Sequence, residues 1–324
     1  MPHAIRFHQN GGPEVLRWET VEVGEPGPGQ ARLRHTAVGL NYIDVYHRTG
    51  LYPNPLPAIP GMEAAGVVEA VGPGVTEVKP GDRVAYASGP MGAYAEARVM
   101  PADRLVVLPA GITGEQGAAM MLQGMTAQYL VRRTYPVKPG DTVLVHAAAG
   151  GVGLILCQWA RHLGATVIGT VSSDAKAELA KANGCHHPVV YTREDFQARV
   201  VELTQGRKVQ VVYDSVGRDT FAKSLDSLAP LGMMALFGQA SGPVPPFDLG
   251  QLAAKGALFI TRPTLFVYTA KRADLLASAG ELFEVVSKGV VKIAVNQRYP
   301  LRDAAQAHRD LEARKTTGST VFTV

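Results

Sequence analysis

The strongest constraint on the fold is a regular alternation of apolar, β-branched runs and helical patterns between Asp141 and Arg262. Six runs have the length and composition of buried strands, at residues 141–147, 165–171, 188–191, 209–215, 233–238 and 257–262. Continuous apolar strands that alternate with helices predict a parallel sheet covered on both faces. Six such strands predict an α/β fold with a doubly wound sheet that binds a dinucleotide.

A glycine-rich segment, AAAGGVG, follows the first strand and opens a helix. From Ala148 to Gly153 it reads A-x-G-x-x-G, one residue different from the usual dinucleotide fingerprint. Small residues let the backbone approach a pyrophosphate, and a helix N-terminus supplies N–H donors. A tight strand-to-helix turn without a ligand is the alternative, but the surrounding six strands favour a nucleotide site.

The end of the second strand, GTVSSDAK, indicates which dinucleotide binds. NAD-binding proteins carry an Asp or Glu there that holds the ribose hydroxyls. Here the strand tip has Ser172 and Ser173, and we expect Asp174 to serve the start of the next helix. Lys176 follows in the first helical turn. Hydroxyls with a cation suit a 2′-phosphate, so the sequence favours NADPH, although Lys176 could equally be an ordinary solvated lysine.

The first 120 residues have short alternating runs that are rich in Gly and Pro, which predicts an antiparallel β-rich domain. Two helical patterns, 273–287 and 301–315, and a final strand, STVFTV, follow Pro263. We assign this tail to the first domain. The predicted domains are therefore 1–123 with 264–324, which is β-rich, and 124–263, which binds the dinucleotide.

Charge and composition exclude several classes of function. The net charge of +4 is dispersed, so binding to nucleic acid is not expected. The apolar run 142–160 is broken by Gly150 and Gly151, which indicates a strand, a turn and a helix rather than a membrane span. The N-terminal residues have no apolar signal core, and the chain has two cysteines, so we expect a cytoplasmic protein.

The segment PGMEAAG, residues 60–66, resembles a metal-binding loop that has lost its ligand. Zinc-dependent alcohol dehydrogenases have Gly-His-Glu at such a place, whereas this chain has Met62, and a thioether is a poor zinc ligand. A structural zinc lobe needs four cysteines. Cys185, His186 and His187 form one metal-like cluster, but adjacent residues rarely ligate one ion. We therefore expect no metal, and Glu63 remains as a candidate hydrogen-bonding support.

No acid–base motif stands out in the sequence. The Tyr-x-x-x-Lys pair of short-chain reductases and the G-x-S-x-G elbow are both absent. An isolated ketone accepts hydride only when a metal or a proton stabilises the developing alkoxide. A quinone or a conjugated enone delocalises the added charge itself. The sequence therefore favours a flat, electrophilic acceptor of this kind.

Several blocks along the chain resemble one family, including HQNGGPEVL, GLNYIDVYHRTGLYP, MEAAGVVEAVGPGV, HAAAGGVGLILCQWA and ITRPTL. They are similar to those of the zinc-free quinone oxidoreductases, the zeta-crystallin-like branch of the medium-chain dehydrogenase/reductase superfamily. The resemblance covers the whole chain. It implies a Rossmann domain, a β-rich GroES-like catalytic domain and NADPH-dependent reduction of a quinone. Alternatives are an enone or alkenal double-bond reductase, and an NADPH-binding structural or RNA-binding protein.

The resemblance also implies roles for individual residues. It places Asn41 and Tyr46 beside the nicotinamide and Tyr52 at the substrate opening, although Tyr46 could be a packing aromatic. It further implies a homodimer joined through the edge strand 257–262. The remaining residues that it places around NADPH are Thr126, Tyr129, Gly150, Gly151, Val152, Ser172, Ser173, Lys176, Tyr191, Ser215, Phe237, Gly238 and Arg314.

Overall fold

The computed structural model describes residues 1–324, which form two compact units. Unit 1 contains Met1–Met125, Tyr268–Ser287 and Ile293–Val324. Unit 2 contains Thr126–Val267 and Lys288–Lys292. The functional domain limits given above, 1–123 with 264–324 and 124–263, stay a prediction.

Unit 2 is built on a six-stranded sheet in which every neighbouring pair is parallel. Its order is β10-β9-β8-β11-β12-β13, so the chain starts in the middle and winds outward twice. This confirms the predicted doubly wound sheet. The strands are β8 (Thr142–Val145), β9 (Thr166–Val171), β10 (His187–Val190), β11 (Val209–Asp214), β12 (Leu228–Leu236) and β13 (Phe259–Thr261).

Both faces of this sheet are covered by helices, and consecutive residues of its strands are therefore buried. Val143, Leu144 and Val145 are all 0% exposed, although their side chains alternate between the two faces. The fold reverses direction between β8 and β11, and such a switch point is where parallel sheets bind ligands. The helices are α3 (Gly151–His162), α4 (Asp174–Ala182), α5 (Phe196–Leu203), α6 (Phe221–Asp226) and α7 (Gly250–Ala254).

Unit 1 contains the predicted β-rich fold. Its seven-stranded sheet has the order β14-β15-β3-β4-β5-β7, with β6 also paired to β3. All pairs are antiparallel except β14 with β15, and the final strand β15 pairs with β3. A separate hairpin joins β1 (His3–Arg6) to β2 (Arg17–Thr20). The sheet strands are β3 (Gln30–Leu40), β4 (Glu63–Val71), β5 (Arg83–Ala87), β6 (Ala97–Pro101), β7 (Val106–Val107), β14 (Val295–Pro300) and β15 (Ser319–Thr323).

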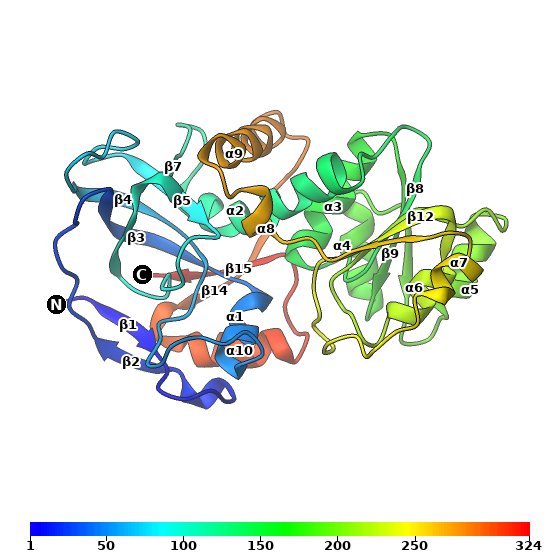
Figure 1. The fold of residues 1–324 in the computed structure, drawn as a ribbon, viewed down its shortest axis with the longest axis horizontal. Helices are drawn as coiled ribbons and strands as arrows, with labels where there is room; N and C mark the ends of the chain where they lie inside the picture. Colours follow the sequence, from blue (N-terminus) through cyan, green and yellow to red (C-terminus); the bar gives the residue numbers. More distant parts are fainter. The chain divides into compact units, whose positions relative to one another are not determined.

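Two helices from opposite ends of the chain lie side by side in unit 1, namely α1 (Tyr42–Thr49) and α10 (Ala304–Glu312) (Figure 1). A 3₁₀ turn, Leu301–Asp303, precedes α10, so the predicted helix 301–315 is shorter than expected. The other helices are α2 (Gly114–Tyr129), followed by a π-helical segment Leu130–Thr134, α8 (Leu265–Tyr268) and α9 (Arg272–Ser287). Short 3₁₀ turns occur at Pro13–Val15 and Ala102–Arg104. None of the helices combines the length and apolarity that crossing a membrane would need.

Candidate functional site

The polar centre of unit 1 begins at the start of α1. Asp44 accepts a hydrogen bond at Oδ2 from the backbone N of Asn41, at 2.9 Å, and so satisfies a donor at the N-terminus of the helix. Asn41 and Asp44 thus form a capping box at the start of the helix. The side-chain amide of Asn41 also faces the sheet, where Glu63 and Gln123 bind it.

Glu63 is the first residue of β4 and is completely buried. Its Oε2 lies 2.7 Å from Asn41 Nδ2, and its Oε1 accepts from the backbone N of Leu122 in α2 at 2.7 Å. A Cβ on Gly39 would lie 2.5 Å from Oε2, so a glycine is needed there for the carboxyl to fit. Burial raises the pKa of Glu63 to about 8, against the opposing hydrogen bonds from Asn41 and Leu122.

The Asn41 amide continues into a chain of polar groups that ends at β15. Gln123 Nε2 lies 3.1 Å from Asn41 Oδ1. Ser319 Oγ lies 2.7 Å from Gln123 Oε1 and 2.8 Å from the carbonyl oxygen of Ala119. Segments far apart in the sequence thus meet at Asn41 through side chains that are all buried.

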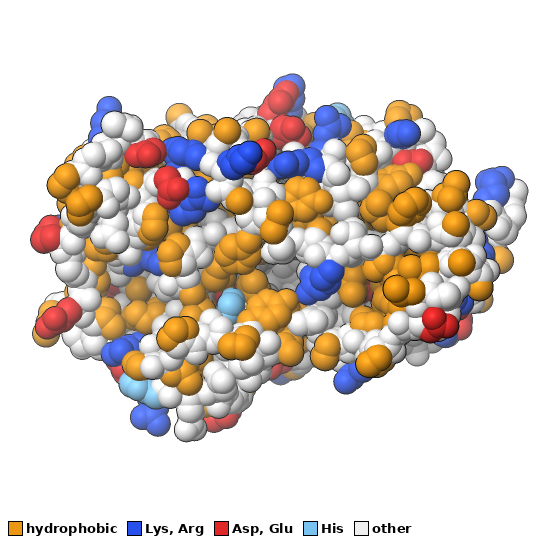
Figure 2. Space-filling model, viewed as in Figure 1, with side chains coloured by type: hydrophobic (Ala, Val, Ile, Leu, Met, Phe, Trp, Pro, Cys, Tyr) orange, Lys and Arg blue, Asp and Glu red, His pale blue; other side chains and the backbone are white.

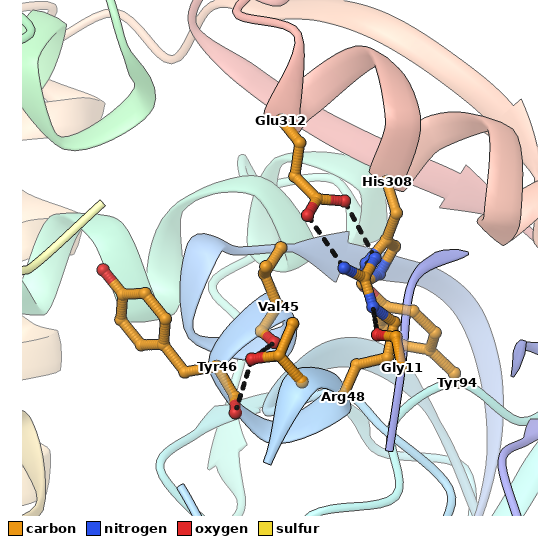
Figure 3. A network of polar contacts seen from close by, with 8 residues as sticks. Gly11, Val45, Tyr46, Arg48, Tyr94, His308 and Glu312 are labelled. Atoms are coloured by element: carbon orange, nitrogen blue, oxygen red, sulfur yellow. Dashed lines mark hydrogen bonds and ion pairs between the residues drawn. The ribbon is translucent and has the colours of Figure 1, made fainter. Parts of the chain in front are cut away.

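A second buried network ties α1 to α10 (Figure 3). Arg48 is 1% exposed and binds both carboxylate oxygens of Glu312, at 2.9 and 2.8 Å. Its Nη1 also lies 3.0 Å from Nδ1 of His308, and Tyr94 Oη lies 3.1 Å from Nε2 of the same ring. Tyr94 in turn donates to Asp44 Oδ2 at 2.9 Å.

The donors fix the direction of this network. Arg48 can only donate, so His308 Nδ1 accepts and its proton sits on Nε2. His308 therefore donates to Tyr94, and Tyr94 donates to Asp44. Burial, followed by the Arg48 charge, lowers the pKa of His308 to about 3. Burial likewise raises the pKa of Asp44 to about 7, although the bonds from Asn41 and Tyr94 oppose it. This network holds the first turn of α1, and with it Asn41, in place.

Aromatic rings on α1 and the following loop form a small apolar surface. The ring centroids of Tyr42 and Tyr46 are 5.4 Å apart, and those of Tyr46 and Tyr52 are 5.2 Å apart. The His47 ring packs edge-on against Tyr52 at 5.6 Å. The structure thus brings the predicted residues Tyr46 and Tyr52 together, with Tyr46 buried and Tyr52 partly exposed. Flat rings of this kind suit contact with a flat substrate.

In unit 2, the glycine-rich segment forms the N-terminus of α3. Gly150 is the N-cap residue, and Gly151 and Val152 begin the first turn. A Cβ on Gly153 would lie 2.2 Å from the carbonyl oxygen of Ala147, so only glycine allows this close approach of helix and strand. This glycine cradle, residues 147–153, therefore fits the pyrophosphate of a dinucleotide, since the first backbone N–H groups of a helix have no partner within the helix.

The other predicted nucleotide contacts in unit 2 lie mostly at the carboxyl ends of parallel strands. Ser172 follows β9, Tyr191 follows β10, Ser215 follows β11, and Phe237 and Gly238 follow β12. Since these strands are parallel, their ends lie along one edge of the sheet. Thr126 and Tyr129 lie in α2 and are buried.

The segment after β9 starts helix α4 as the sequence predicts, with Asp174 as the first residue of the helix. Ser173, the N-cap of α4, accepts from the backbone N of Lys176 at 3.4 Å. Asp174 has another partner, because its carboxylate forms a two-point ion pair with Arg193, with Nη1 to Oδ2 at 2.8 Å. The sequence gives no sign of this contact, because Arg193 lies beyond the third strand. In the fold, Arg193 brings a cation to this edge of the sheet. Arg314 belongs to unit 1, so its contact with the 2′-phosphate stays a prediction.

The donor set of the chain fits a dinucleotide better than a metal ion. No three His, Cys, Asp or Glu side chains are grouped as a metal site would require. Met62 is buried, and in the cluster of Cys185, His186 and His187 the Nδ1 of His186 accepts from the backbone N of Val167. Cys157 and Cys185 are both buried and free.

Comparisons with known proteins agree with this geometry. Residues 27–110 match the family described as Alcohol dehydrogenase GroES-like domain, and residues 151–275 match Zinc-binding dehydrogenase. The chain is 54% identical to a quinone oxidoreductase of Pseudomonas aeruginosa and 50% identical to a 2-haloacrylate reductase of a Burkholderia species, each over 99% of both chains.

Solved structures show the same fold. The quinone oxidoreductase of Escherichia coli, determined in complex with NADPH, superimposes with a TM-score of 0.98 at 47% identity, over 99% of this chain and 100% of the other. The Zinc-binding dehydrogenase match covers a segment without a set of zinc-ligating residues, as in the zinc-free branch that the sequence resembles. The chain therefore belongs to the zinc-free quinone oxidoreductases of the medium-chain dehydrogenase/reductase superfamily.

Proposed function

We propose that the protein reduces quinones with NADPH. The observation that carries this proposal is the glycine cradle at the start of α3, which lies at the ligand-binding edge of a doubly wound sheet. The relatives named quinone oxidoreductase, one of them solved with NADPH, support the same assignment. When bound, NADPH supplies the hydride, and the protein positions it against the acceptor.

The site around Asn41 fits an acceptor that needs little help with its negative charge. In a quinone, the ring delocalises the charge that arrives with the hydride, so neither a Lewis acid nor a strong proton donor is required. We propose that Asn41 and Tyr46 contact the nicotinamide and that Tyr52 contacts the quinone. NADPH oxidation with a panel of quinones, compared with a panel of enones, tests the acceptor class. A higher kcat/KM for the enones would overturn the assignment.

The preference for NADPH over NADH follows from the tip of β9. No carboxylate is free there to hold ribose hydroxyls, because Asp174 is paired with Arg193. Ser172, Ser173 and Lys176 supply donors suited to a 2′-phosphate. Two charge-assisted hydrogen bonds at about 1.5–3 kcal/mol each favour NADPH by roughly two to four orders of magnitude in affinity.

Dissociation constants for both cofactors test this preference. Lys176→Ala is expected to weaken NADPH much more than NADH, because the amine is a point charge that NADH does not use. Lys181→Ala, on the exposed part of the same helix, is the matched control and is expected to leave the ratio of the two constants unchanged. Equal affinities in the wild type would refute the interpretation of this segment.

We also propose a homodimer that forms through the free edge of β13, the last strand of the sheet. Large apolar side chains are exposed on and near this edge, including Phe259 at 54%, Leu249 at 72% and Val267 at 72%. An unpaired apolar edge strand favours pairing with a second copy. A monomer in light scattering at micromolar concentration would contradict this proposal.

Nucleic acid is not a proposed partner. On the face shown in Figure 2, Lys and Arg side chains are interspersed with acidic and apolar ones and form no continuous basic stripe. A cytoplasmic location stays a proposal, supported by the two buried thiols, which remain free rather than forming a disulfide.

A further inference from the structure

The buried carboxyl of Glu63 stands at one end of a chain of four hydrogen bonds. The chain runs from Glu63 to the amide of Asn41, then to the amide of Gln123, then to the hydroxyl of Ser319, and ends at the carbonyl of Ala119. Every side chain in it is at most 6% exposed, so water does not replace these partners. Each contact must therefore pair one donor with one acceptor.

The hydroxyl of Ser319 determines the direction of the chain. It has a single proton but lies 2.8 Å from the Ala119 carbonyl and 2.7 Å from Gln123 Oε1, and both of these oxygens are acceptors. All four contacts are satisfied only when the amides of Gln123 and Asn41 are both turned over. Gln123 then donates to Ser319, and Asn41 donates to Gln123. The oxygen of Asn41 now faces Glu63, which must donate a proton to it.

We propose that Glu63 is a positioning residue that carries a proton at Oε2, donates it in a hydrogen bond to Asn41 and so fixes which end of the Asn41 amide faces Gln123. This inference rests on the proposed contact between Asn41 and the nicotinamide. When Glu63 loses its proton, the Asn41 amide turns over. The second N–H of this amide and the second lone pair of its oxygen, which are free to face the cofactor, then exchange positions. Glu63 thereby controls cofactor binding without touching the cofactor.

The surroundings of Glu63 favour the protonated form. Its other oxygen accepts from Leu122 N, which holds the carboxyl in one orientation. The titratable groups that face it are acidic, namely Asp44 from α1 and Tyr86 from β5, and no cation is in contact with it. Burial raises the pKa of Glu63 to about 8, so the acid form prevails at neutral pH.

Glu63→Gln isolates the protonated state. The Leu122 N–H needs an acceptor, so the oxygen of the new side chain must face Leu122. Its amide nitrogen then faces Asn41, where it can only donate, as the protonated carboxyl does. The variant is therefore locked in the proposed orientation at every pH. Glu69→Gln makes the same change on the same strand, at a side chain that pairs with Arg32 and Arg34, and serves as the control.

Infrared spectroscopy of the purified protein provides a readout that does not depend on activity. The difference spectrum between wild type and Glu63→Gln is expected to contain a protonated carboxylic acid band at pH 7 that disappears above pH 9. Glu69→Gln should leave that band in place. Absence of the band at pH 7 would overturn the proposal.

Cofactor binding provides the second readout. The NADPH dissociation constant of the wild type, divided by that of Glu63→Gln, should be near one at pH 7 and rise about tenfold at pH 9, because only the protonated fraction binds well. A ratio that stays within twofold would refute the positioning role even if the infrared band is present. Asn41→Ala separates the two proposals. If it leaves NADPH affinity and kcat unchanged, Asn41 does not contact the cofactor, whereas the infrared result still decides the protonation of Glu63.

Ser319→Ala provides an independent variant if Glu63→Gln does not fold. It removes two hydrogen bonds from the protonated arrangement but only one from the ionised arrangement. The infrared band of the acid should therefore disappear at a lower pH than in the wild type. An unchanged transition would show that the hydroxyl does not set the direction of the chain.

Discussion

Replacing Glu312 by Gln tests the network that holds α1. The buried guanidinium of Arg48 makes two hydrogen bonds to this carboxylate, one to His308 at 3.0 Å and one to the Gly11 carbonyl at 3.1 Å. Glu312→Gln keeps the shape and one acceptor but removes the negative charge. Arg48 then stays buried with no full counter-charge at this position.

The structure sets the size of the effect. Loss of one partner of a buried ion pair costs about 3–5 kcal/mol, and a hydrogen bond to a charged group contributes about 1.5–3 kcal/mol. The side chain of Glu312 is 31% exposed, so solvent screens part of the loss, and one acceptor remains in the variant. We expect a loss of about 2–3 kcal/mol. For a unit of this size, that lowers Tm by about 4–12 °C.

Thermal unfolding followed by far-UV circular dichroism, with urea titration at 25 °C, measures this effect. Asp174→Asn is the matched control, because Asp174 also makes a two-point pair with an arginine, Arg193. There the two side chains are 71% and 59% exposed, so the midpoint should stay within measurement error. A loss for Glu312→Gln no larger than that of the control would refute the argument that burial of Arg48 makes its partner important.

Three further predictions concern the site. Treatment with a chelator should leave quinone reduction unchanged, because the chain has no set of zinc-ligating side chains; loss of activity that zinc restores would contradict this. Tyr52→Ala should raise the quinone KM more than the NADPH dissociation constant, since the Tyr52 ring packs on Tyr46 and is partly exposed. Unchanged quinone kinetics would show that the substrate binds elsewhere. The folded pKa values of Glu63 and Asp44, about 8 and about 7, lie above their usual 4.5 and 3.8, so their contribution to stability is complete below those usual values and is lost as pH rises to the folded values. Between about pH 5 and 7, each of these two carboxyls should lower the free energy of unfolding by about 1.4 kcal/mol per pH unit. Glu63→Gln should therefore make the slope of this free energy against pH shallower. An unchanged slope would show that Glu63 ionises in the folded protein as it does in the unfolded chain.

The sequence alone determined the architecture of unit 2. Its apolar runs, 141–147 and the five that follow, are local patterns. Each becomes a strand of one parallel sheet, because burial on both faces demands continuous apolar residues. The glycine cradle could also be predicted from the sequence, since Gly153 is the residue that a close approach of helix and strand requires. Met62 also shows from the sequence alone that the histidine of the zinc-dependent enzymes is missing at this position.

Tertiary structure decided what those residues touch. Nothing in the sequence pairs Arg48 with Glu312 or Tyr94 with His308, because such partners lie far apart in the chain and meet only when α10 packs against α1. The sequence correctly predicted that Asp174 starts a helix, but only the fold shows that Arg193, from beyond the third strand, pairs with it. Glu63 was recognisable only as a candidate support. Its burial, its bond to Leu122 and its link to Asn41 depend on how β4, α1 and α2 pack together, and these contacts give the carboxyl its raised pKa.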